Sequence, residues 1–308
     1  KKTNDILVQT PYIAAMGEGG EPWVNGASMN NQGVEFTVSF KSDPSSEFQW
    51  AVSANIGTYK TELTDLPSNV INKYAGDGVH DLILGRSPNS AYGLVADGIF
   101  KTQEEVDAHA DQPGKAVGRI RYKDLDGDGV INETYDRTWI GCYDPDFFGG
   151  LNFDFAYKGF DLNLFFEGMF GNDVNSDWKK ESDIWLFTNP AWKNHATRML
   201  GGWSPDNPNS DIPAISNNTA NQEQRFSSWF IEDGSYIKLR NIELGYTFPT
   251  KLIKKMHMSN LRLYAAAYNV FTLKKFWGDD KYTSFDPERP SYHYLTPFTF
   301  NFGINVSF

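Results

Sequence analysis

The feature that most constrains the fold of this chain is a set of segments in which apolar and polar residues alternate strictly. A period of two residues places all apolar side chains on one face of a β-strand. The dipeptide Lys158-Gly159 separates two of these segments and predicts a hairpin with a two-residue turn. Two weaker segments, residues 2–8 and 261–273, bring the expected number of strands to about eight. The six clear segments are residues 34–40, 48–56, 151–157, 160–166, 242–248 and 298–308.

The expected strands are long, and the connections between them are unequal. The best of them run to about 9 to 13 residues, whereas the mean strand of a soluble domain has about 5 to 6. Successive connections of an antiparallel sheet lie at opposite ends, so the short turns fall at one end and the long loops at the other. Outer-membrane β-barrels show this asymmetry, and their strands have this length. The short connections are 41–47, 158–159 and 249–260, and the long ones are 9–32, 61–148, 171–235 and 274–297.

Composition excludes several other classes of protein. The chain has a mean hydropathy of -0.49 and no run of 18 or more apolar residues, which excludes a membrane-spanning helix but not spanning strands. With 28 basic and 39 acidic side chains, the net charge of -11 argues against a nucleic-acid partner. The single cysteine, Cys142, excludes a disulfide framework and a four-thiolate zinc site.

The main alternative fold is a secreted β-sandwich, whose strands also alternate with one face buried. A sandwich makes turns every 8 to 12 residues or so, whereas this chain combines long strands with loops of dozens of residues at one end. The pattern therefore favours an all-β chain that forms a transmembrane antiparallel β-barrel. In such a barrel the polar faces of the strands line an aqueous lumen.

Short motifs along nearly the whole chain resemble those of the SusC/RagA family of TonB-dependent outer-membrane transporters from the Bacteroidota. Each motif alone is weak, but they occur together in the order that the family has. The motifs are Asn31-Gln32-Gly33-Val34-Glu35, Asp97-Gly98-Ile99-Phe100, Tyr122-Lys123-Asp124-Leu125-Asp126-Gly127-Asp128-Gly129, Tyr157-Lys158-Gly159-Phe160-Asp161-Leu162, Asp233-Gly234-Ser235-Tyr236-Ile237-Lys238-Leu239-Arg240-Asn241 and Asn269-Val270-Phe271-Thr272.

The resemblance implies that residues 1–308 are the C-terminal portion of a 22-stranded, plugged barrel, with extracellular loops at 61–148 and 171–235. No plug domain or TonB box is recognised in the chain. The family implies location in the outer membrane of a Gram-negative bacterium and uptake of nutrients such as glycan or peptide oligomers. Its implied partners are a SusD-like surface lipoprotein, the TonB complex, outer-membrane lipid and the remainder of the barrel. The alternatives are a secreted, calcium-stabilised, glycan-binding β-sandwich and a free-standing barrel of eight strands.

A candidate calcium loop begins at Asp124. Carboxylates occupy its positions 1, 3 and 5, Gly129 allows the sharp turn at position 6, and Ile131 could anchor the loop. Position 12 departs from the usual pattern because it is Tyr135, and Asp136 follows one residue late. The alternative is a solvated acidic turn without a cation. The expected ligands are Asp124, Asp126, Asp128, Val130, Asn132 and Asp136.

Aromatic residues suggest two further roles. Tyr59, Tyr157, Phe160 and Tyr246 lie near expected strand ends and predict an interfacial girdle. The loop 171–235 carries a group of tryptophans that could stack on solutes, although packing of the loop itself is the favoured interpretation. These tryptophans are Trp178, Trp185, Trp192, Trp203 and Trp229.

Catalysis finds little support in the sequence, and no enzyme activity is expected. The histidines do not form a metal-binding spacing, and Cys142 has no recognisable nucleophile context. Asp286 and Glu288 form an acid pair of the kind glycosidases use, but that mechanism depends on a separation that sequence does not define. The histidines are His80, His109, His195, His257 and His293.

The final alternating segment predicts which residues face lipid. A register change of one residue would reverse every side chain, so the pattern fixes the face. We expect the lumen to receive Thr299, Asn301, Gly303, Asn305 and Ser307, and the lipid to receive Phe298, Phe300, Phe302, Ile304, Val306 and Phe308.

Overall fold

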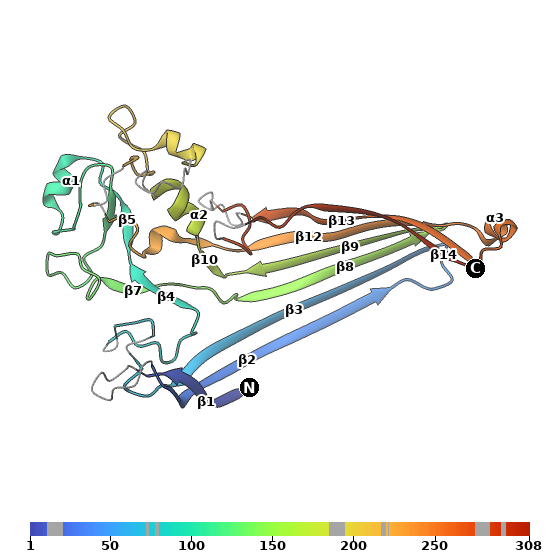
Figure 1. The fold of residues 1–308 in the computed structure, drawn as a ribbon, viewed down its shortest axis with the longest axis horizontal. Helices are drawn as coiled ribbons and strands as arrows, with labels where there is room; N and C mark the ends of the chain where they lie inside the picture. Colours follow the sequence, from blue (N-terminus) through green and yellow to red (C-terminus); the bar gives the residue numbers. More distant parts are fainter. Residues whose placement is uncertain are drawn as a thin grey trace.

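Eight long strands dominate the fold of the chain in the computed structural model (Figure 1). The structure describes residues 1–308 except 11–20, 72–73, 78–79, 185–194, 217–219, 221, 275–283 and 291–293. The long strands are β1 (Lys2–Gln9), β2 (Trp23–Lys41), β3 (Phe48–Asp65), β8 (Phe147–Tyr157), β9 (Phe160–Phe170), β12 (Tyr236–Thr247), β13 (Asn260–Lys274) and β14 (Thr299–Ser307).

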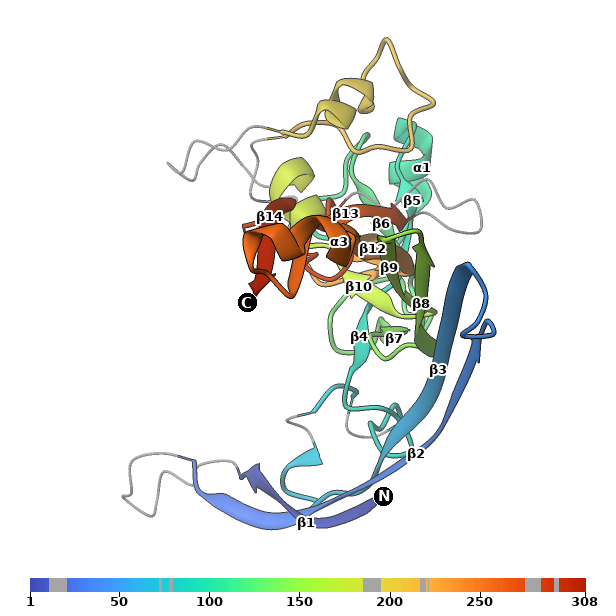
Figure 2. The same cartoon turned by 90° about the vertical axis from the view of Figure 1, so that its right-hand side faces the viewer.

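These strands form one antiparallel sheet in the order of the chain, β1-β2-β3-β8-β9-β12-β13-β14. Figure 2 shows that the sheet curves into an arc when it is viewed along the strands. Among the described residues, every other sheet has only two strands. The sandwich alternative is therefore wrong, because no second large sheet covers the apolar face. The expected all-β architecture and its eight long strands are confirmed.

The two faces of the sheet have opposite character. Directly paired residues share a face, and the register aligns apolar with apolar positions from strand to strand, for example Leu164 with Ile242 and Leu263 with Ile304. The apolar face is open to its surroundings, since Phe302 is 82% exposed. Exposed apolar area on this scale marks a surface that another apolar phase covers. The register of β14 places its residues on the two faces as the alternation predicts.

The turn between β8 and β9 has the expected two residues. Lys158 has a φ of 48° and Gly159 a φ of 88°. A type I′ turn requires positive φ at both central residues, and its twist matches the twist of the flanking strands. The prediction of a hairpin is confirmed.

The long connections carry smaller elements, which lie at the end of the sheet away from the short turns (Figure 1). Their core includes Leu94, Ile120, Tyr122, Ile131 and Phe230, none of which is more than 1% exposed. No helix among the described residues is long and apolar enough to cross a membrane. The smaller elements are β4 (Ser90–Leu94), β5 (Ala96–Ile99), α1 (Gln103–Ala108), β6 (Ile120–Tyr122), β7 (Arg137–Cys142), β10 (Asp173–Asn175), α2 (Asp177–Lys179), the π-helix Lys180–Ile184, β11 (Ile231–Asp233) and the 3₁₀ turns Thr197–Gly201 and Ser228–Phe230. At the opposite end of the sheet, the connection between β12 and β13 carries α3 (Thr250–Ile253) and the 3₁₀ turn Lys254–Met256.

Two strands begin earlier than the sequence predicts. β12 starts at Tyr236 rather than residue 242, because a register shift between Leu239 and Asn241 interrupts the alternation. β2 starts at Trp23 rather than residue 34, and its first half is rich in Asn, Gly and Ser. Backbone pairing with β1 and β3 extends this half into a strand that side-chain periodicity does not show.

Candidate functional site

The polar face of the sheet carries the candidate functional site, and its middle is a ladder of amides and acids. The Asn152 amide donates to Asp154 at 2.6 Å, and the Asn163 amide donates to both residues, at 3.0 and 2.7 Å. The Asn241 amide on β12 donates in turn to the Asn163 oxygen at 3.0 Å. The ladder crosses three strands and lines the polar face of the large sheet with hydrogen-bonding groups. We call this face of the sheet the wall.

An arginine cluster lies on the same face near the short turns. The Arg262 guanidinium donates to the Asp161 carboxylate through two nitrogens and to Glu243 at 2.7 Å. Asp161, Glu243 and Arg262 come from β9, β12 and β13, so all three charges are fixed to the wall. Gly245 leaves the space that the guanidinium fills, since a Cβ atom there would collide with Arg262 and Asp161.

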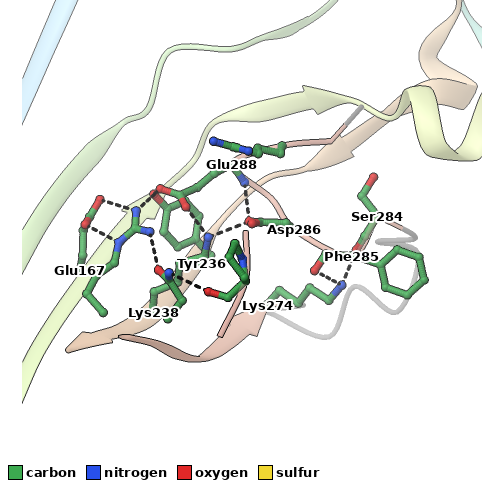
Figure 3. A network of polar contacts seen from close by, with 12 residues as sticks. Glu167, Tyr236, Lys238, Lys274, Ser284, Phe285, Asp286 and Glu288 are labelled. Atoms are coloured by element: carbon green, nitrogen blue, oxygen red, sulfur yellow. Dashed lines mark hydrogen bonds and ion pairs between the residues drawn. The ribbon is translucent and has the colours of Figure 1, made fainter. Parts of the chain in front are cut away.

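A larger charged network lies on the same face where β12 begins, directly after the long connection 171–235, and Figure 3 shows its polar contacts. The Lys238 side chain is only 3% exposed, and its ammonium group lies 2.7 Å from the Asp286 carboxylate. It also pairs with Glu288, which accepts a hydrogen bond of 3.0 Å from the Tyr236 hydroxyl. β12 and the loop between β13 and β14 therefore meet at this network.

Arg240 joins this network through the bulge in β12. Its Nε atom donates to Glu167 on β9 at 2.8 Å, and its Nη2 atom pairs with Glu288. The register shift at residue 240 inserts one extra residue into β12 relative to β9, so Arg240 and Asn241 both reach the polar face. Bulges commonly redirect side chains in this way next to functional sites.

The sequence does not reveal this network, although parts of it are visible there. Tyr236, Lys238 and Arg240 alternate at a spacing of two, which signals one polar strand face. The acid pair Asp286 and Glu288 is engaged by cations of β12, since Lys238 pairs with both residues and Arg240 pairs with Glu288. The pairing joins residues about fifty positions apart, which no local pattern encodes.

The acidic loop at residues 124–136 folds as a tight turn outside the sheet. Ligand atoms of Asp124, Asp126 and Asp128 lie within 4.8 Å of one another. The Asp124 carboxylate accepts the backbone N–H groups of Gly127 at 2.7 Å and Gly129 at 2.9 Å. The pKa of Asp126 is raised. A hydrogen bond from the Asp128 N–H group lowers this pKa, but slight desolvation and the charges of the neighbouring carboxylates together raise it by more. Three of the expected metal ligands are thus gathered where a divalent cation would relieve their repulsion.

The other expected ligands have different places in the loop. The Asp136 side chain is fully buried and accepts the N–H groups of Leu125 at 2.8 Å and Asn132 at 2.7 Å. The Asn132 oxygen accepts from Thr134 and Tyr135. Val130 is 44% exposed and bridges to Asp111 through its backbone. Asp136 therefore closes the loop, and it lies outside the group of three carboxylates.

Ile131 anchors the acidic loop in the manner that the sequence suggests. Its side chain is 1% exposed and belongs to the core that contains Tyr122 and Phe230. Burial raises the pKa of Tyr122 to about 12. Tyr122 and Ile131 flank residues 123–130 and are both buried in this core, so the two ends of the turn are held in place.

The tryptophans of the loop 171–235 pack within the protein where the structure describes them. Trp203 and Trp229 contact the loop core, and the Lys179 ammonium lies 4.7 Å from the ring of Trp229. Trp178 contacts Phe285 edge-on, with ring centroids 4.7 Å apart. Trp185 and Trp192 lie outside the described residues. These contacts agree with a packing role for the three described tryptophans.

The aromatic girdle is confirmed in part. Phe48, Tyr157, Phe160 and Tyr246 form a row of direct cross-strand partners on the apolar face beside the short turns. Tyr59 does not belong to the girdle, because it pairs with Gly33 on the polar face, where its ring contacts Phe148 at 6.0 Å. The alternation of β3 places Tyr59 on the same face as Asn55, so the prediction that Tyr59 belongs to the girdle is wrong.

Histidine and cysteine form no site in the described part of the chain. His109 packs against Phe100 with ring centroids 5.0 Å apart, and burial lowers its pKa. Cys142 is a free, half-buried cysteine. Of the described His, Cys, Asp and Glu residues, only the three carboxylates of the acidic loop are close enough to hold a metal ion. His293 lies outside the described residues.

Comparison with known proteins identifies relatives of the chain. No family model matches the chain. TonB-dependent receptor P3 of Formosa agariphila is 29% identical over 325 residues and TonB-dependent receptor SusC of Bacteroides thetaiotaomicron 25% identical over 321, each match covering 100% of this chain but 31% and 29% of the relative. The chain thus spans about a third of the length of these relatives.

Solved structures share the fold. The structure of the RagAB peptide transporter matches with a TM-score of 0.75 and 23% identity, over 100% of this chain and 32% of the other. The same importer in an open state matches with a TM-score of 0.73. These relatives are named as receptors and transporters, and none of them as an enzyme. As its motifs predict, the chain is similar over its full length to TonB-dependent receptors, SusC among them, and it has the fold of part of an outer-membrane β-barrel transporter.

Proposed function

We propose that this chain forms part of the wall and mouth of an outer-membrane importer that is driven by the TonB complex. The observation that carries the proposal is a curved sheet with an apolar outer face and a continuous polar inner face, matched over its full length by TonB-dependent receptors. A polar lumen lets a solute pass without contact with lipid. Nutrients that are glycan or peptide oligomers are the proposed cargo.

A SusD-like surface lipoprotein of a Bacteroidota cell is the proposed partner. Support comes from the similarity to SusC and to the RagAB structures. The loops between the long strands gather at the end of the sheet away from the short turns, where a surface protein would meet them (Figure 1). Purification of the full transporter should recover this lipoprotein, and recovery of the transporter alone from mild detergent would argue against the partnership.

Uptake by whole cells tests the proposed import. Cells should be offered fluorescently labelled mixtures of oligosaccharides and of peptides, with and without deletion of the gene and of tonB. We expect both deletions to abolish uptake of the same mixture, because the two products act in one pathway. Uptake that survives both deletions would contradict the proposal.

We also propose that the acidic loop binds calcium as a structural clip. Asp124, Asp126 and Asp128 supply carboxylates, and Asp136 holds the ends of the loop together. The ion would offset the mutual repulsion of three acids on one turn. Metal analysis of the purified transporter should find calcium, and a chelator should lower its thermal stability. A transporter whose melting is indifferent to chelator would contradict the site.

A further inference from the structure

The charged network at the mouth differs in one respect from the arginine cluster near the turns. In the cluster, Arg262 is neutralised by Asp161 and Glu243, which both belong to wall strands. In the network, two of the three carboxylates come from residues 284–290, here called the latch segment. We call Lys238 and Arg240 the wall cations, and Asp286 and Glu288 the latch carboxylates. Among the described residues, the wall supplies only Glu167 for these two cations, and both carboxylate partners of Lys238 belong to the latch segment.

The latch carboxylates sit on the wall much as a bound acidic peptide would. They are two residues apart and are joined by Pro287, and the Asp286 carboxylate accepts the Glu288 N–H at 3.1 Å. Lys238, Arg240 and the Tyr236 hydroxyl receive them with donors from one face of β12 (Figure 3). Cationic donors from adjacent positions of a rigid strand form a ready site for carboxylates.

The net charge of the network changes sign when the latch carboxylates are removed. The two wall cations and the three carboxylates Glu167, Asp286 and Glu288 sum to a net charge of -1 (2 minus 3). Without the latch carboxylates the sum is +1 (2 minus 1), and Lys238 loses both partners. A buried cation without a partner is strongly unfavourable. Displacement of the latch segment therefore costs less when another anion replaces its carboxylates as the partner of Lys238.

The latch segment is held by contacts that can be monitored separately. The hydroxyls of Ser284 and Ser176 lie 2.8 Å apart, and both side chains are buried. On the wall side, the Lys274 ammonium donates to the backbone oxygens of Ser284 and Phe285. The pair Ser176 and Ser284 thus reports whether the segment is seated.

We propose that the wall cations, together with the Tyr236 hydroxyl, form a binding site for solute carboxylates, and that the latch carboxylates occupy this site in the resting protein. A solute that carries carboxylates competes for the wall cations and releases the latch segment. This inference rests on the proposed import function, and it names carboxylate-bearing oligomers as the solutes that this part of the lumen recognises.

Disulfide formation in the full transporter tests the proposal without any transport step. Ser176→Cys and Ser284→Cys are combined with Cys142→Ser, and the yield of the cross-link is measured under mild oxidation. Tri-glutamate is the probe, and tri-glutamine is its uncharged counterpart. We expect tri-glutamate to lower the yield and tri-glutamine to leave it unchanged. Equal yields with both peptides would overturn the proposal.

The chain offers a matched control pair. Ser39 on β2 and Ser53 on β3 also have hydroxyls 2.8 Å apart, and they lie on the wall away from the latch segment. The cross-link of Ser39→Cys with Ser53→Cys should form equally with either peptide. A fall with tri-glutamate at this pair as well would show an unspecific effect and would contradict the site.

Two further measurements keep the test decisive if the buried cysteines disturb assembly. Asp286→Asn with Glu288→Gln should lower the cross-link yield without any peptide, and an undiminished yield would contradict a latch held by charge. A fluorophore on Arg289→Cys, at an exposed position of the same segment, should change its emission with tri-glutamate only. Because neither readout requires TonB, failure here is distinguishable from failure of the import function.

Discussion

At the scale of single residues, the wall depends on close approaches that only certain side chains allow. Gly245 lies between the Arg262 guanidinium and the Asp161 carboxylate, so the absence of a side chain there permits a three-charge cluster. Asp136 is a different case, since its buried carboxylate is satisfied entirely by the backbone of its own loop. Both residues act through geometry that their neighbours in sequence do not reveal.

The change Gly245→Ala should destabilise the barrel wall. The added methyl group would displace the Arg262 guanidinium and the Asp161 carboxylate, which are the ends of flexible side chains, so the expected loss is that of partly exposed ion pairs, about 1 kcal/mol or less. Thermal unfolding of the full transporter, followed by its heat-dependent mobility on gels, measures the loss. Gly201→Ala is the control, because a Cβ atom there meets only Ile212 at 3.9 Å. Equal melting temperatures for the two variants would contradict the crowding at Gly245.

The changes Asp126→Asn and Asp136→Asn should separate the calcium site from the closure of its loop. Asp136→Asn leaves a buried N–H without its acceptor, which costs about 1 to 3 kcal/mol whether or not calcium is added. Asp126→Asn should remove only the stabilisation that calcium supplies. Melting curves with calcium and with chelator distinguish the two outcomes. Glu133→Gln, an exposed neighbour, should behave as the unmodified protein.

At the scale of elements, each long strand places alternate residues on the apolar face and on the polar face of the sheet. On β14 the register pairs Phe302 with Ala265 on the apolar face and Asn301 with Ala266 on the polar face. Neighbouring residues of one strand therefore meet lipid and water respectively. The bulge in β12 departs from this rule, because the adjacent residues Arg240 and Asn241 both lie on the polar face.

Lysine substitutions at two adjacent positions of β14 test this division. Phe302→Lys would place a charge in hydrocarbon, at a cost of about 2 to 4 kcal/mol near the bilayer midplane. We expect this change to reduce the amount of transporter assembled in the outer membrane, measured by surface labelling of intact cells. Asn301→Lys should assemble normally. Reduced assembly of Asn301→Lys alone would reverse the assignment of the faces.

At the scale of the whole molecule, the described sheet is open along its two outer strands. β1 pairs only with β2, and β14 pairs only with β13, within the part of the chain that the structure describes. An unpaired backbone group in lipid costs several kcal/mol, so a spanning sheet has to close. Further strands must therefore pair with these edges in the membrane.

Residues 1–308 expressed alone should not form a stable monomeric barrel. The open edges and the exposed apolar face favour aggregation or association with other chains. Size-exclusion chromatography in detergent, combined with gel mobility before and after heating, measures the outcome. A monomer of defined mass that is heat-modifiable would contradict this expectation. The full transporter, purified in the same detergent, serves as the positive control.

Local structure in this protein follows from the order of its residues. Alternation with a period of two predicts the strands, and it also assigns the faces of β14, because periodicity is a property of neighbouring residues. The Lys158-Gly159 turn follows from the positive φ angles that a short hairpin requires. The grouping of Asp124, Asp126 and Asp128 follows from their spacing on one turn.

Contacts between residues that are far apart in the sequence follow from the tertiary structure alone. The bulge that brings Arg240 to the polar face depends on pairing with β9 and β13, and the side chosen by Tyr59 depends on the phase of β3. Lys238 meets Asp286 because a long loop returns to the wall, and sequence periodicity carries no information about loop closure. Contacts between residues far apart in the chain are set by the packing of whole elements, and the contact of the latch segment with β12 is of this kind.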